Sequence, residues 1–107
     1  MKRLIYFLSS ILFGLTILST SLHASTVKGK IFYSQNLKNL CGYSGEVMGK
    51  KYTVNEWRTI YNSNKLNEVI QVLCPKAPSI DSEKDITNLY HFLSSFASDS
   101  GNVPSCN

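Results

Sequence analysis

The feature that most constrains this chain is its set of three cysteines, Cys41, Cys74 and Cys106, which follow an N-terminal segment typical of protein export. In an oxidising compartment thiols tend to pair, so an odd number leaves one thiol over. One bridge would staple a small domain, and one thiol would remain. We therefore expect a disulfide-stapled domain that acts outside the reducing cytoplasm.

The export segment occupies residues 1–24. Lys2 and Arg3 form a positive start, and an apolar run follows over residues 4–18, ahead of a small-residue stretch ending at Ala24. This is the layout of a secretory signal peptide cleaved after Ala24. An uncleaved anchor is the alternative, but the run is near the lower limit for a membrane span and no basic cluster follows it. We expect a periplasmic or secreted protein with no stable membrane anchor after cleavage.

The mature chain, residues 25–107, has about 83 residues and predicts one domain. A hydrophobic core alone is marginal at this size, which makes a covalent staple physically useful. Removing Lys2 and Arg3 lowers the formal net charge from +4 to +2. The remaining basic residues form no phosphate-binding stripe with interleaved aromatic residues, so we do not expect a nucleic-acid partner.

Apolar residues recur at spacings of three and four, the periodicity of amphipathic helices. This pattern predicts helices over residues 27–40, 53–61, 66–73 and 82–97. No run alternates convincingly with a period of two, as a half-buried strand would. The predicted fold class is therefore all-α, a bundle of about four short helices in one domain.

Local signals mark where these helices begin and end. Thr53 and Glu56 form a capping box, and Gly42 can adopt the left-handed conformation that stops a helix. Residues 42–50 hold three glycines and are predicted to be a loop. Residues 98–107 are predicted to be a short mobile tail. The expected interior consists of Trp57, Tyr61, Leu73, Leu89, Leu93 and Phe96.

For the disulfide we favour Cys41 with Cys74, because each lies at the end of a predicted helix, where the chain is already held. Their bridge would close a loop of about 33 residues and stabilise the fold by roughly 3–4 kcal/mol in the chain-entropy model. The two pairings through Cys106 stay open at this point. If Cys106 is the free thiol, it can form a mixed disulfide with an unknown periplasmic partner or a dimer.

Three runs of sequence carry a resemblance to a known family: Cys41-Gly-Tyr-Ser-Gly, Tyr52-Thr-Val-Asn-Glu-Trp, and Ile-Gln-Val-Leu-Cys74-Pro. With the aromatic closing helix, their order resembles small periplasmic cytochrome-c-like domain proteins that lack the C-x-x-C-H haem-attachment motif. The resemblance covers residues 28–97. It implies a small cytochrome-c-like helical bundle.

The chain departs from the haem-binding pattern where the chemistry matters. Covalent attachment needs two thiols and a histidine next to the second. At the corresponding stretch, Lys38 stands in place of the first thiol and Gly42 in place of the histidine. We therefore expect no covalently bound haem and no resident cofactor. Haem held without a covalent bond remains the alternative.

A ligand pocket, if there is one, is expected to involve Met48, His91 and Trp57 beside the glycine-rich loop. Met48 is an axial ligand by residue type, but His91 is the one histidine of the mature chain and is more often a half-buried helix residue. No cysteine or histidine spacing matches a zinc site or a C-x-x-C redox motif. We expect no metal site, no catalytic residues and no enzymatic activity.

The sequence thus predicts an exported, non-enzymatic, cytochrome-c-like module without covalent haem. Its expected role is protein interaction or accessory work near an envelope or electron-transfer complex. The alternative is a protein that binds haem non-covalently or performs thiol-redox or electron-transfer chemistry.

Overall fold

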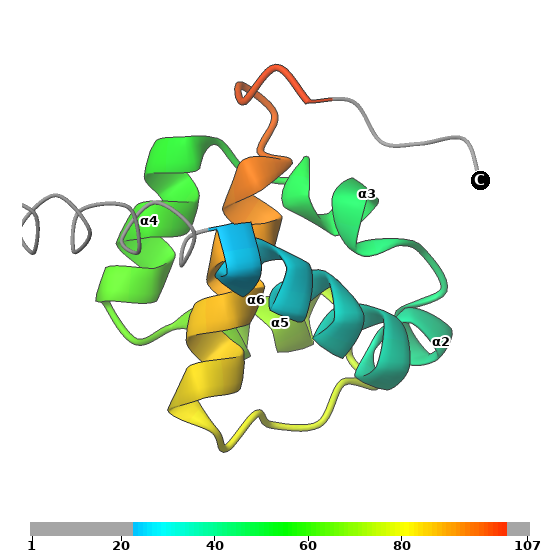
Figure 1. The fold of residues 1–107 in the computed structure, drawn as a ribbon. Helices are drawn as coiled ribbons and strands as arrows, with labels where there is room; N and C mark the ends of the chain where they lie inside the picture. The colour runs from blue at the N-terminus through cyan, green and yellow to red at the C-terminus, as the bar shows by residue number, and fades with distance from the viewer. Residues whose placement is uncertain (1–22, 103–107) are drawn as a thin grey trace, which may run out of the picture.

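A computed structural model describes residues 23–102 of the chain. Residues 1–22 of the predicted signal peptide, and Cys106, lie outside the described residues. Within them the chain is helical and has no strand, which confirms the all-α prediction. The helices are the N-terminal helix, helical over residues 23–36, then α2 Lys38–Cys41, α3 Gly45–Gly49, α4 Val54–Asn62, α5 Leu66–Leu73 and α6 Glu83–Ser95 (Figure 1).

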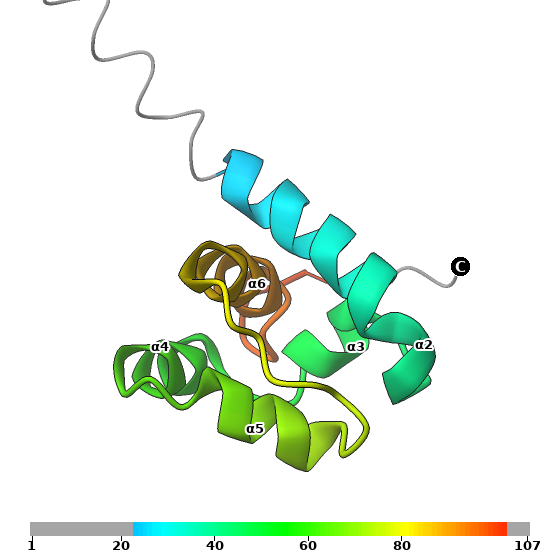
Figure 2. The same cartoon turned by 90° about the horizontal axis from the view of Figure 1, so that it is seen from below.

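Helix α6 is the centre of the arrangement. The N-terminal helix crosses one side of it, and α4 and α5 cover the opposite side (Figures 1 and 2). Helix α3 also packs against α6. Because α6 is surrounded in this way, its buried residues Leu89, Phe92 and Leu93 form the middle of the core.

The first predicted helix does not run unbroken to residue 40. It is interrupted at Leu37, which is buried, and α2 leaves at an angle (Figure 2). Backbone hydrogen bonds from Leu37 N to Tyr33 O and from Cys41 N to Leu37 O continue through the bend. Gly42 then ends α2 in the left-handed conformation, with φ of 81°, as predicted.

The prediction of a loop over residues 42–50 is wrong in part, because α3 occupies its second half. Ser44 caps this helix by accepting a hydrogen bond from Val47 N. Gly45 lies against the Phe92 ring, and Gly49 lies against the backbone of Leu93. The two glycines therefore allow α3 to pack closely on α6. The prediction of a loop took them as a sign of backbone flexibility.

Helix α4 begins as predicted. Glu56 N donates to Thr53 Oγ1 over 3.1 Å, and Thr53 N donates to Glu56 Oε1 over 3.0 Å, so both halves of the capping box are present. The following turn contains Asn64 in the left-handed region, with φ of 57°. Helix α6 is capped by Ser82, whose hydroxyl accepts from Asp85 N.

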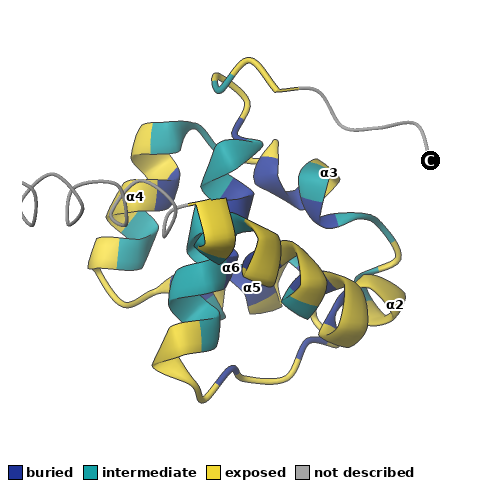
Figure 3. Ribbon diagram, viewed as in Figure 1, coloured by how far each residue is buried: buried dark blue, intermediate teal, exposed yellow. Residues whose placement is uncertain are grey.

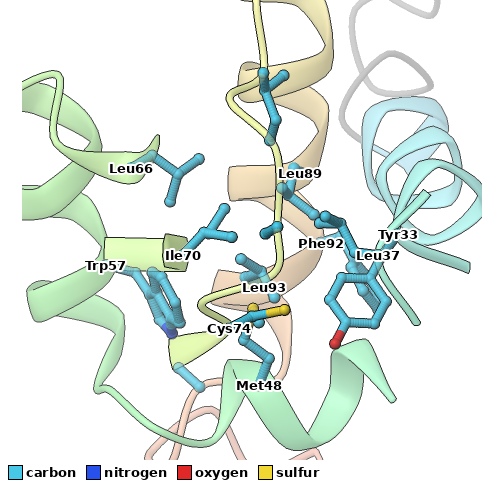
Figure 4. Packing of buried hydrophobic residues seen from close by; sticks show 13 residues of the cluster. Tyr33, Leu37, Met48, Trp57, Leu66, Ile70, Cys74, Leu89, Phe92 and Leu93 are labelled. Atoms are coloured by element: carbon cyan, nitrogen blue, oxygen red, sulfur yellow. The ribbon is translucent and has the colours of Figure 1, made fainter. Parts of the chain in front are cut away.

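Three of the six expected interior residues, Trp57, Leu89 and Leu93, are fully buried. The other three are only partly buried: Tyr61 in α4, Leu73 at the end of α5, and Phe96 directly after α6. The core also takes in residues that the sequence analysis did not place there (Figures 3 and 4). These include Tyr33, Leu37, Met48, Leu66, Ile70, Cys74 and Phe92.

The first residues of the predicted tail are hydrogen-bonded to the body of the domain. Ser98 N donates to Tyr52 O over 3.0 Å, and Val54 N donates to the carboxylate of Asp99 over 2.8 Å. Asn102 Nδ2 donates to Ser95 O. Residues 98–102 are thus tied to the start of α4 and the end of α6.

Candidate functional site

The disulfide joins Cys41, at the end of α2, to Cys74, directly after α5. Their Cα atoms are 5.1 Å apart and 33 residues separate them in sequence. The expected staple is therefore present. Cys74 is 2% exposed, while Cys41 is partly exposed, so an attacking thiol would reach the bridge from the Cys41 side.

Two tyrosines reinforce the same junction. The hydroxyl of Tyr43 donates to Leu73 O over 3.0 Å, next to Cys74, and the hydroxyl of Tyr33 donates to Tyr43 O over 2.9 Å. This chain of contacts joins the N-terminal helix, the segment before α3 and the end of α5. The disulfide and the tyrosines together hold three separate segments at one place.

The environment of these tyrosines favours their neutral form. Burial raises the pKa of Tyr33 far above the usual tyrosine value, with further contributions from Tyr43 and the nearby Glu46 carboxylate. Burial also raises the pKa of Tyr43. Both hydroxyls therefore stay protonated and keep donating their hydrogen bonds well into the alkaline range.

The residues of the predicted ligand pocket do not share one exposed site. Met48 and Trp57 are both 0% exposed, and Figure 4 shows them within the hydrophobic core. The indole Nε1 of Trp57 donates to Gly49 O over 2.8 Å, which fixes the ring. His91 is half-buried on α6 beside the Tyr90 ring.

On the surface formed by residues 23–102, two hollows are lined by residues other than Met48, Trp57 and His91. One, of about 300 Å³, lies where α4 ends and where α5 and α6 begin. The other, a groove of about 440 Å³, lies between α4 and α5. A ligand pocket built on Met48 and His91 stays a prediction, and it would require the core around Met48 to open.

The residues at and after Cys41 do not suit covalent haem. Thioether attachment consumes a free cysteine thiol, but the sulfur of Cys41 is already bonded to Cys74. The residue after Cys41 is Gly42, which has no side chain to ligate iron. The residues present therefore do not fit covalent haem attachment.

Residues 23–102 contain no group of three or more histidine, cysteine, aspartate or glutamate side chains placed to hold a metal ion. Over the same part of the chain, no helix has the length and apolar character needed to cross a membrane.

Fold and site together define a small all-α domain stapled by the disulfide between Cys41 and Cys74. The hydrogen bonds from Tyr33 to Tyr43 and from Tyr43 to Leu73 lie beside it, and we call them the tyrosine latch. Comparisons with protein families, with curated proteins and with solved structures find no match to this chain.

Neither the tyrosine latch nor the place of the N-terminal helix in the core was predicted from the sequence. Tyr33 and Leu37 are four residues apart on one helical face, a signal that was visible in the sequence. The hydrogen bond from Tyr43 to Leu73 joins residues 30 positions apart, and no local sequence pattern predicts it.

Proposed function

We propose that this protein is an exported, cytochrome-c-like module that carries no covalent haem and acts by binding another protein. Its role would be accessory, beside an envelope or electron-transfer complex. One observation carries the proposal: Cys41, where the resemblance would put haem attachment, is bonded to Cys74 and closes the domain on itself.

The packing around this bridge supports a structural use of the position. Cys74, Met48 and Trp57 are all buried in one cluster of side chains. Met48 is surrounded by core residues, and the Trp57 ring is held by its bond to Gly49 O. A side-chain core and a staple stabilise this interior in the way that a cofactor does in a haem protein.

An absorption spectrum tests the haem half of the proposal. The full chain is expressed with its own N-terminal segment in a cell that exports and matures c-type cytochromes, with a C-x-x-C-H cytochrome as the positive control. We expect no Soret band in this protein. A Soret band that survives acid–acetone extraction would overturn the proposal, and one that is removed by extraction would favour non-covalent haem binding.

The interaction half is tested by trapping mixed disulfides in the exporting cell. The wild-type chain is compared with Cys106→Ser after acid quenching and alkylation of free thiols. We expect one free thiol per chain, at Cys106, and a mixed disulfide with one defined partner that is absent from the variant. Three free thiols would show that the Cys41–Cys74 disulfide does not form. A disulfide that includes Cys106 would show that this thiol is not available to a partner.

A further inference from the structure

The N-terminal helix has a second apolar face that no described element covers. Its inner face is buried at Gly29 and Tyr33. On the outer face, Val27 is 43% exposed and Ile31 is 50% exposed. The two side chains are four residues apart, so they lie one above the other on the helix surface. We call Val27 and Ile31 the outer stripe.

Lysines flank the outer stripe on both sides. At 100° per residue, Lys28 falls on one side of the Val27–Ile31 line and Lys30 falls on the other. Both lysines are exposed, and Lys30 is 3.6 Å from Glu46 with 63% of its side chain accessible. The outer stripe is therefore an apolar ridge with Lys28 on one edge and Lys30, which is ion-paired with Glu46, on the other.

The charge of the described residues is also divided along the sequence. Residues 23–52 carry five lysines and one carboxylate, Glu46, whereas residues 53–102 carry four basic residues and six carboxylates. The N-terminal helix belongs to the basic half and lies on the far side of α6 from α4 and α5 (Figure 2). The cations that border the outer stripe itself are Lys28 and Lys30, and they favour an acidic partner there.

We propose that the outer stripe is the docking surface for an acidic amphipathic helix of a partner protein. This inference rests on the proposed interaction function and names its surface and the chemistry of its partner. A partner helix with apolar residues at matching three- and four-residue spacings would cover Val27 and Ile31. Glutamate or aspartate on the borders of its apolar stripe would then lie against Lys28 and Lys30.

A protein helix fits this surface better than a lipid surface does. The apolar ridge is narrow and bordered by charge on both edges, the arrangement that sets partner choice between paired helices. The chain also supplies a contrast: Val72 on α5 is 77% exposed, yet it lies one turn from the carboxylate of Glu68 and in the acidic half. If apolar exposure alone drove binding, Val72 would serve equally well.

The test uses the full exported chain and two synthetic helical peptides of about 15 residues. Both peptides carry the same leucine stripe, bordered by glutamate in the first and by lysine in the second. Binding is measured by fluorescence anisotropy at low and at physiological salt. We expect the acidic peptide to bind at least about tenfold more tightly than the basic one, with affinity falling as salt rises.

Variants locate the binding surface. Ile31→Gln should weaken binding of the acidic peptide about tenfold, and Lys28→Glu should weaken it about threefold at low salt. The matched controls, Val72→Gln and Lys76→Glu, change an exposed valine and an exposed lysine elsewhere and should leave affinity unchanged. Circular dichroism spectra checked for each variant separate lost binding from lost folding.

Equal binding of both peptides, no binding of the acidic peptide at about 1 mM, or equal effects of Val72→Gln and Ile31→Gln would overturn the proposal. Vesicles with and without anionic lipid form a separate arm. Binding that is confined to the anionic vesicles would replace the protein partner by a lipid surface. A haem-bearing spectrum would defeat the proposed function and leave the peptide result standing, so the two failures are distinguishable.

Discussion

The backbone of Gly29 lies directly against the carbonyl oxygen of Asn88, so the N-terminal helix and α6 touch with no side chain between them. A Cβ atom at residue 29 would also stand 2.8 Å from Phe92 Cβ, closer than real Cβ contacts allow. The crossing of the first and last helices of the domain therefore depends on a hydrogen atom in place of a side chain.

We predict that Gly29→Ala lowers the free energy of unfolding by about 2 kcal/mol, because the overpacking exceeds the gain in helix propensity. Urea unfolding of the purified chain measures it. Ser34→Ala, at an exposed position of the same helix, is the matched control and should change stability by less than about 0.5 kcal/mol. Equal stability of Gly29→Ala and wild type would contradict the close crossing.

We predict that Cys41→Ala/Cys74→Ala lowers the free energy of unfolding by about 3 kcal/mol, because the bridge restricts a long loop of the unfolded chain. Denaturation with and without a thiol reductant checks this. The reductant should bring wild type to the stability of the double variant and leave the variant itself unchanged. A wild type that is insensitive to complete reduction would refute the staple.

We predict that Asp99→Ala destabilises the domain by about 1 kcal/mol, because Val54 N at the start of α4 loses its acceptor. Asp99→Asn retains a side-chain oxygen and should recover most of the loss. Hydrogen exchange at the amide of Val54 gives a local readout, with protection lost in the alanine variant. Unchanged protection in Asp99→Ala would show that residues 98–102 are not held as described.

The tyrosine latch predicts a decline in stability at alkaline pH. The pKa of Tyr33 is raised in the folded state by burial, so its contribution is complete below the usual tyrosine value of about 10. Above that value the unfolded chain loses its phenolic proton first, and stability falls as pH rises further. Tyr43 acts in the same sense.

We expect the urea midpoint of the wild type to fall above pH 10. Tyr33→Phe should make this decline shallower, although the variant also loses the hydrogen bond to Tyr43 O. Tyrosinate absorbance should show part of the tyrosine set ionising only as the protein unfolds. The matched control is Tyr52→Phe, which removes a phenol outside the latch. An identical pH profile in Tyr33→Phe and Tyr52→Phe would contradict the assignment.

The sequence by itself determined the helical character, the capping box at Thr53 and Glu56 and the stop at Gly42. It favoured a staple between Cys41 and Cys74 and left the two pairings through Cys106 open, and the structure decided between them. Periodicity, caps and turns act through backbone hydrogen bonds within a few residues, so they can be read locally. The pairing of Cys41 with Cys74 was favoured because each lies at the end of such a locally defined helix.

Only the tertiary structure decided which faces are covered. Gly45 and Gly49 look like loop residues in sequence, yet they form α3 because α6 accepts a helix without side chains at those points. Tyr61 and Phe96 are only partly buried, while Met48 and Tyr33 are fully buried in the core. The physical reason is that the burial of a helix face depends on which segment, distant in sequence, packs against it. Local sequence patterns do not specify that contact.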